Sequence, residues 1–180
     1  MPRFPSIARA GALLLVCCGV FAFSVGRSHA DVVAPACSIN QLRLAHGGFA
    51  EGGTQQLAAA FVLKNVSSRA CSMRGYPRVT LLDSDGKKLS FTDRKGGDEQ
   101  GWSESPKTVT LAPGMKAEVL ILENTCTFRP TAIVSRIRLS LPAHTNTETA
   151  RFRSSTDFEY CRSNDPSGDV LHISPIERTG

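Results

Sequence analysis

Closely spaced cysteines and histidines, on which metal sites and redox motifs depend, are missing from this sequence after residue 30. Four of its six cysteines follow residue 30, and no two of those four lie within thirty residues of each other. His46, His144 and His172 are equally isolated. Because zinc sites use pairs such as C-x-x-C, or histidines close to a cysteine, the sequence predicts no metal.

Signatures of catalysis are also scarce. No G-x-S-x-G element, S-x-x-K element or Cys–His pair has the surroundings that nucleophilic catalysis requires, and no P-loop or dinucleotide motif occurs. Asp157 and Glu159 share one face of a predicted strand about 6–7 Å apart, a separation found in glycoside hydrolases. Alternating acids are ordinary on an exposed strand, so we predict no catalytic residue and no cofactor.

One acidic segment begins like a calcium-binding loop. Asp83–Gly86 has the sequence D-S-D-G, but the twelfth position counted from Asp83 is Arg94 rather than a bidentate glutamate. Lys87 and Lys88 follow directly and bring positive charge to the same place. The segment is therefore predicted to be a hairpin turn.

Residues 1–30 have the composition of a secretory signal peptide. Arginines near the start precede an uncharged apolar stretch from Gly11 to Phe23, and small residues before Asp31 predict cleavage after Ala30. The sequence therefore predicts a secreted or periplasmic protein, with residues 31–180 as a single domain.

The apolar stretch of the leader is too short for a stable transmembrane helix. No membrane span is therefore expected after cleavage. Two alternatives stay open, namely retention of the leader as an anchor and lipid attachment at Cys17 or Cys18.

The charge that remains without the leader is small. The whole chain carries a formal charge of +5, but removing residues 1–30 takes three arginines and no acid and leaves +2. A nucleic-acid-binding domain needs a strong basic patch, whereas the remaining basic residues are dispersed along the sequence. The alternations Arg136/Arg138 and Arg151/Arg153 are typical of a solvated strand face. Nucleic acid is therefore not expected as a partner.

The four later cysteines, Cys37, Cys71, Cys126 and Cys161, predict a disulfide framework, because an even number behind a signal peptide is typical of oxidising compartments. Three pairings are open. The sequential pairing would close loops of 34 and 35 residues, and each bridge would stabilise the fold by about 4 kcal/mol in the chain-entropy model.

Apolar residues alternate with polar ones in short runs bounded by turn residues, which is the pattern of β-strands. We predict strands over residues 41–44, 56–65, 78–83, 88–92, 107–112, 116–123, 135–141, 151–160 and 169–174. The one helical candidate, 126–134, contains Pro130 and is predicted to be a turn. The prediction is an all-β fold, an antiparallel immunoglobulin-like β-sandwich with two disulfides, and a barrel is the alternative.

Two turns and one long loop stand out. Asp85-Gly86 predicts a type I′ hairpin turn, and Pro113-Gly114 predicts a type II turn. The longest polar loop is predicted over Asp93–Pro106 and contains Trp102. Trp102 is the candidate binding residue, because rigid scaffolds often carry binding residues on loops; its alternative role is to cap the end of the sandwich.

The segment Phe61–Leu89 resembles a family of secreted bacterial domains called domain of unknown function 4232. The resemblance spans residues 37–175, and the insertion-like loop 93–106 departs from it. The shared features are Lys64-Asn65, Ser67-Ser68, Arg74–Pro77, the turn Asp83–Gly86, Val109–Gly114 and the four later cysteines. The resemblance implies an exported, disulfide-bonded, immunoglobulin-like domain and supplies no activity.

These observations favour an exported, non-catalytic binding or interaction module of the cell envelope. The expected contact surface is the set of loops at one end of the sandwich, and the expected partner is an envelope polysaccharide or protein that the sequence leaves unidentified. The alternatives are a small secreted hydrolase and a protease-inhibitor-like protein that presents Asp93–Pro106 as a rigid loop.

Overall fold

The fold is built from β-strands. The computed structural model describes residues 34–51, 56–96, 105–152, 158–161, 164–166 and 169–179. In this part of the chain the only helical element is a single 3₁₀ turn, η1 (Ile39–Gln41), and no helix there is long and apolar enough to cross a membrane.

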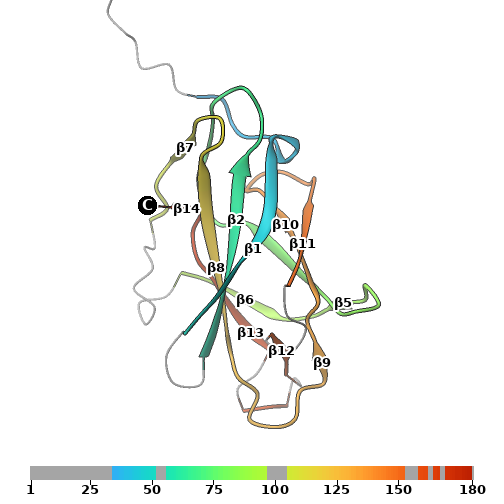
Figure 1. Cartoon of the computed structure of the whole chain (residues 1–180). Helices are drawn as coiled ribbons and strands as arrows, with labels where there is room; N and C mark the ends of the chain where they lie inside the picture. The colour runs from blue at the N-terminus through green and yellow to red at the C-terminus, as the bar shows by residue number, and fades with distance from the viewer. Residues whose placement is uncertain are drawn as a thin grey trace, which may run out of the picture. The chain divides into compact units, whose positions relative to one another are not determined.

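The larger of two main sheets has the strand order β1-β2-β8-β13-β6. Its central strands run antiparallel, whereas β6 pairs with β13 in parallel. A further short strand, β14, pairs with β8 beyond the end of β13 (Figure 1). The bounds are β1 (Leu42–Glu51), β2 (Gln56–Asn65), β6 (Thr92–Lys95), β8 (Lys116–Asn124), β13 (Val170–Ile173) and β14 (Glu177–Arg178).

The smaller main sheet is antiparallel throughout and has the order β11-β10-β4-β5. Two separate strand pairs, β3 with β7 and β9 with β12, complete the fold. The bounds are β3 (Cys71–Met73), β4 (Arg78–Leu82), β5 (Lys88–Leu89), β7 (Val109–Leu111), β9 (Ala132–Ile133), β10 (Arg136–Ser140), β11 (Glu148–Arg151) and β12 (Glu159–Tyr160).

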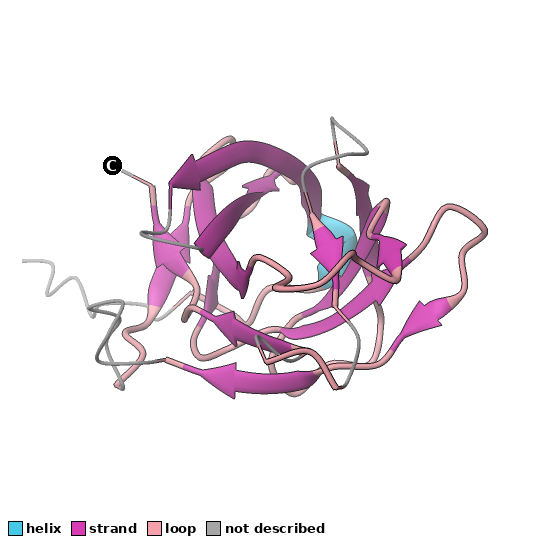
Figure 2. Ribbon diagram, turned by 90° about the horizontal axis from the view of Figure 1, so that it is seen from below, coloured by secondary structure: helices cyan, strands magenta, loops and turns pink. Residues whose placement is uncertain are grey.

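The two main sheets share one hydrophobic core. Alternate residues of β2 and β8, such as Phe61 and Ile121, join alternate residues of β4 and β10, such as Leu81 and Ile137, in a single buried cluster. The view in Figure 2 shows strands on opposite sides of this interior. The packing is therefore that of a β-sandwich. The all-β class and the two disulfides are confirmed, and the immunoglobulin-like strand order stays a prediction.

A proline interrupts the last strand of the larger sheet. Between β13 and β14, Pro175 has no N–H to donate. The Ser174 N–H still donates to the Leu120 carbonyl oxygen, and the Ser174 hydroxyl accepts from the Leu120 N–H at 2.8 Å. The Ser174 hydroxyl thus takes the place of a backbone carbonyl as the acceptor for the Leu120 N–H. β13 and β14 therefore both pair along the same side of β8.

The structure corrects one of the two predicted turns. Gly114 has φ +81° and the Met115 N–H donates to the Ala112 carbonyl, as a type II turn requires. A type I′ turn would need positive φ at both central residues, but in the hairpin after β4 only Gly86 has it, at +83°. The loop of that hairpin has three residues, and Gly86, in the left-handed conformation, is the last of them.

Two further sequence predictions are wrong in detail. Of the predicted strand 151–160, Arg151 ends β11 and Glu159–Tyr160 form β12, whereas Phe152 and Phe158 are in no strand and residues 153–157 lie outside the described residues. The predicted loop 93–106 begins inside β6, since residues up to Lys95 pair with β13. The short strands β3, β9 and β14 were not predicted at all.

Candidate functional site

A groove opens where the chain passes from the smaller sheet to the larger one. β5 pairs with β4 only at Leu81 and Leu82. The chain then leaves β5 through Ser90 and Phe91 and enters β6 of the other sheet. The first half of β4 therefore has no β5 residue beside it, and a groove of about 640 Å³ lies between this half of β4 and β6.

Four cations line this groove, which we call the basic groove: Arg78 from β4, Lys88 from β5, Lys95 from β6 and Arg138 from β10. Asp93 is the one acidic residue of the lining. The remaining polar lining consists of hydroxyl groups, from Thr80, Ser90, Ser140, Thr145 and Thr147. The groove therefore combines excess positive charge with many small hydrogen-bonding groups.

Strand register determines the spacing of three of these cations. Arg138 lies opposite Thr80, and Lys88 lies opposite Leu82. Arg78, Thr80 and Leu82 alternate along β4 and so share one face of the sheet. The positions of Arg78, Arg138 and Lys88 therefore advance along the strand direction in steps of about 7 Å, two residues at a time.

Arg78 is held in place, whereas the other three cations are free to meet a ligand. Its Nε donates to the Ser140 hydroxyl at 3.3 Å, and its Nη2 donates to the His144 carbonyl oxygen. These bonds fix the segment that carries Thr145 and Thr147. Within the described residues, the side chains of Lys88, Lys95 and Arg138 are exposed and form no hydrogen bond or ion pair.

The wall of the groove at Ser90 is tied to the strand pair β9–β12. The Tyr160 hydroxyl donates to the Ser90 carbonyl oxygen. Burial raises the pKa of Tyr160, and the nearby Asp169 carboxylate raises it further. Tyr160 therefore keeps its proton at neutral pH and remains a donor to this wall.

Sequence reasoning treated these cations as dispersed and did not bring them together. Arg138 was assigned to a solvated strand face, which is correct, but β4 and β10 are far apart in sequence. The sequence pattern that bears on the groove is a cation two residues before a hydroxyl residue, which places both on the same strand face. It occurs at Arg78-x-Thr80, Lys88-x-Ser90 and Arg138-x-Ser140.

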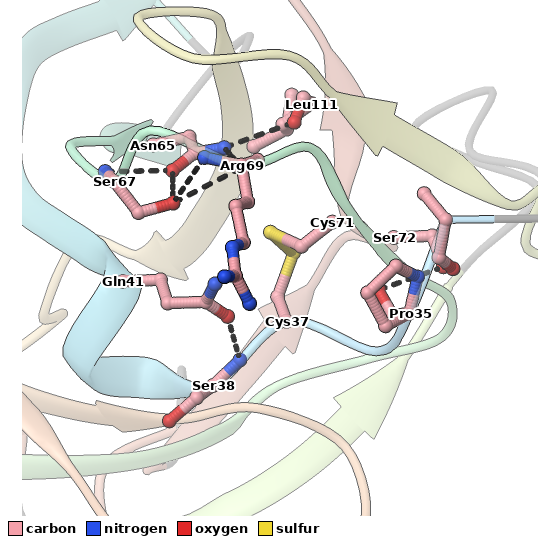
Figure 3. Close-up of a disulfide and its surroundings, with 11 residues drawn as sticks. Pro35, Cys37, Ser38, Gln41, Asn65, Ser67, Arg69, Cys71, Ser72 and Leu111 are labelled. Atoms are coloured by element: carbon pink, nitrogen blue, oxygen red, sulfur yellow. Dashed lines mark hydrogen bonds between the residues drawn. A yellow bond between two sulfur atoms is a disulfide. The ribbon is translucent and has the colours of Figure 1, made fainter.

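The two disulfides have the sequential pairing. Cys37 bonds to Cys71 with a Cα–Cα distance of 4.7 Å, and Cys126 bonds to Cys161 at 5.3 Å. The first bridge anchors the start of the described chain beside β3 (Figure 3), where the Ser72 N–H donates to the Pro35 carbonyl. It is buried in the core, whereas Cys126 is only half-buried.

Near the first bridge, the fully buried amide of Asn65 connects three segments (Figure 3). Its Nδ2 donates to the carbonyl oxygens of Arg69 and Leu111 at 2.8 and 3.0 Å. Its Oδ1 accepts from the N–H and hydroxyl of Ser67. Both ends of the amide are therefore satisfied, as a buried polar group requires.

The variant Asn65→Asp is expected to lower the free energy of unfolding by about 3 kcal/mol, because a carboxylate oxygen would face two carbonyl oxygens in the buried site. Urea unfolding of the oxidised protein measures this loss. Asn40→Asp, at an exposed position of η1, makes the same change of charge and is the control. Equal stability of the two variants would contradict the role given to the Asn65 amide.

A group of carboxyls lies around the second disulfide. Glu123 is 4% exposed, and its Oε1 accepts from the Glu159 N–H at 2.8 Å. The Glu159 Oε2 accepts from the Cys126 N–H at 3.3 Å. Burial raises the pKa of Glu123 to about 9, and repulsion by the Glu159 carboxylate adds to the rise.

Asp165 extends this group of carboxyls to the next loop. It is buried, and its two oxygens accept from the N–H groups of Thr127 and Phe128 at 3.1 and 2.8 Å. Together with the disulfide, these bonds hold the 124–128 loop against Glu159, Cys161 and Asp165. The described residues contain no group of three side chains arranged to hold a metal ion.

The residues considered for catalysis occupy separate places. His46 is buried among Phe49, Phe61 and Phe152, with ring centroids 4.6 to 5.4 Å away. His172 lies within β13, on the face opposite Leu171 and Ile173. His144 borders a second cavity that Ser72 also lines, but the Ser72 hydroxyl donates to the Ala34 carbonyl oxygen at 2.7 Å.

Several predicted sites lie outside the described residues. Trp102 is among them, as is most of the loop predicted to act as an inhibitor segment. Asp157 is also outside, so the proposed carboxylate pair is described only at Glu159. These assignments stay predictions.

The fold and the site define an all-β, disulfide-bonded domain with a cation-lined groove and carboxyls buried in structural roles. The chain belongs to the family described as domain of unknown function (DUF4232), whose model matches residues 37–177. The resemblance found in the sequence is thereby confirmed. No curated protein and no solved structure matches the chain.

Proposed function

We propose that this chain is an exported, non-catalytic binding module of the cell envelope and that its basic groove takes an anionic ligand. The observation that carries this proposal is the gathering of Arg78, Lys88, Lys95 and Arg138 from four strands around one groove. Excess positive charge around one groove attracts ligands of opposite charge.

The state of the cations supports binding. A cation that already pairs with a carboxylate attracts an anionic ligand only weakly. Lys88, Lys95 and Arg138 are exposed and have no acidic partner among the described residues. Four cations against Asp93 alone give the lining an excess of three positive charges. Such a patch accelerates the approach of anions and favours their binding over that of neutral molecules.

The two disulfides support export. Structural disulfides persist in oxidising compartments and are rare in the cytosol. Cys37, Cys71, Cys126 and Cys161 are all paired, and the leader predicted over residues 1–30 gives a route to such a compartment. Location in the cell envelope is the part of the proposal that rests on the sequence alone.

The groove favours binding over hydrolysis. Its described lining holds one carboxylate and neither histidine nor cysteine. A glycoside hydrolase of the usual kind needs two carboxyls across its cleft, and a nucleophilic serine needs a neighbouring base. Asp93 alone provides neither arrangement.

A matched pair of double variants tests the proposal. Lys88→Ala/Arg138→Ala removes two cations of the groove. Arg43→Ala/Lys64→Ala removes two exposed cations that face each other on β1 and β2. On an immobilised dextran sulfate column, the groove variant is expected to elute at clearly lower salt than the unaltered protein, because fewer counterions are released on binding.

The control variant is expected to elute close to the unaltered protein, although it has lost the same charge. An equal shift for both variants would mean that net charge rather than the groove governs retention, and the proposal would then be wrong. Circular dichroism checks that both variants remain folded.

A further inference from the structure

The cations of the basic groove are spread over several strands and do not converge on one point. Arg138 of β10 and Lys88 of β5 lie on opposite sides of β4, and along the strand direction Arg78, Arg138 and Lys88 are spaced about 7 Å apart. A single compact anion such as phosphate is usually bound where donors converge on one point, as at a backbone nest. Cations spread in this way instead complement a chain that carries negative charge at intervals.

The hydroxyl groups of the lining point to a ligand that both donates and accepts hydrogen bonds. Thr80, Ser90 and Ser140 stand next to the cations, and Thr145 and Thr147 close one end. Each hydroxyl serves as donor and acceptor. Asp93, as a carboxylate, only accepts, and it repels the anionic groups of any ligand. A ligand that also carries donors such as sugar hydroxyls offsets this repulsion by bonding to Asp93, which a polymer with anionic groups alone does not do.

The lining also has apolar members. Val79 and Phe91 are half-buried against the core, Leu89 is buried in it, and all three contribute to the lining of the groove. Pyranose rings present C–H groups on their faces and hydroxyls on their edges, and they bind well where an apolar side chain lies beside hydrogen-bonding groups. The basic groove has both kinds of group.

An acidic peptide fits this groove less well. Peptides in extended form bind mainly by adding a strand to a free sheet edge. At the groove, the free strand edges are Arg78–Thr80 of β4 and Thr92–Lys95 of β6, and both are shorter than the length of about five or six residues that is most common for a strand.

Resting on the function proposed above, we infer that the ligand of the basic groove is a linear acidic glycan whose repeating units carry carboxylates beside free hydroxyls. The carboxylates meet Arg78, Arg138, Lys88 and Lys95. The hydroxyls meet Asp93 and the serine and threonine side chains.

Isothermal titration with defined probes tests this inference. Oligogalacturonate is expected to bind the disulfide-bonded protein, and its methyl ester, which keeps the hydroxyls but loses the charge, is expected to bind at least about tenfold more weakly. Lys88→Ala/Arg138→Ala is expected to lose about tenfold in affinity for oligogalacturonate. The control Arg43→Ala/Lys64→Ala is expected to stay within about twofold.

Asp93→Asn separates hydroxyl recognition from charge. The substitution removes one repulsive charge for every polyanion, so the informative quantity is the affinity ratio between oligogalacturonate and polyacrylate, which carries carboxylates and no hydrogen-bond donor. This ratio is expected to fall at least about threefold, because only the sugar loses a charge-assisted hydrogen bond to the carboxylate.

The outcomes distinguish the two proposals. If polyglutamate, dextran sulfate or inorganic phosphate binds through the groove as tightly as oligogalacturonate, the glycan inference is overturned and the anionic binding function stands. If no anion shows a difference between the groove variant and the control variant, both proposals fail.

Discussion

Replacing Cys37 and Cys71 together by alanine is expected to lower the free energy of unfolding by about 4 kcal/mol. The bridge joins residues 34 positions apart, and closing a loop of this length removes much of the entropy of the unfolded chain. Both cysteines are almost fully buried in the core, at 1% and 0% exposure. Loss of the sulfur atoms therefore also leaves space that the core fills poorly.

The second bridge provides the matched comparison. Cys126 and Cys161 are 35 residues apart, so their replacement by alanine costs nearly the same loop entropy. Cys126 is half-buried, and less packing is lost there. In urea unfolding followed by circular dichroism, the Cys37/Cys71 variant is expected to be the less stable of the two. The reverse order would show that the buried bridge adds nothing beyond loop closure.

Raising the pH from 5 to 8 is expected to lower the free energy of unfolding through Glu123. In the folded protein the pKa of this carboxyl is about 9, against an ordinary value of 4.5. Between these values the unfolded chain has released its proton while the folded chain keeps it. Folding then takes up a proton, so stability falls as the pH rises, by up to about 1.4 kcal/mol per pH unit.

Glu123→Gln tests this pH dependence. A glutamine oxygen still accepts from the Glu159 N–H but does not ionise. The variant is expected to lose most of the slope and to exceed the unaltered protein at pH 8 by on the order of 3 kcal/mol. Glu177→Gln, at an exposed position of β14, is the control and keeps the slope. Parallel stability curves for the unaltered protein and Glu123→Gln would refute the assignment.

Sequence patterns located the long strands well, for a physical reason. β2 matches its predicted range of 56–65, and β8 differs from its predicted range by one residue. Both strands have a partner strand on each side, and both alternate residues that face the core with residues that face away from it. β9 and β14 contain two residues each and β3 contains three, too few for any period to show. Their pairing depends on partners elsewhere in the chain.

The basic groove was beyond sequence reasoning for a related reason. Arg78, Lys88 and Arg138 were visible as polar residues of predicted strands, whereas Lys95 was assigned to a loop. Arg78 and Arg138 become neighbours only through the pairing of β4 with β10. Nothing local specifies that pairing. The cysteine framework was easier to predict, because cysteine number and an exported setting restrict the chemistry without any knowledge of register.

The position of β13 has a consequence for how the chain reaches its native state. β13 lies between β8 and β6, although it is nearly the last strand in sequence (Figure 1). A ribosome delivers the protein from its N-terminus, so β6 has no neighbour in its sheet until residues 170–173 emerge. Nascent chains therefore cannot complete the larger sheet until residues 170–173 have been synthesised.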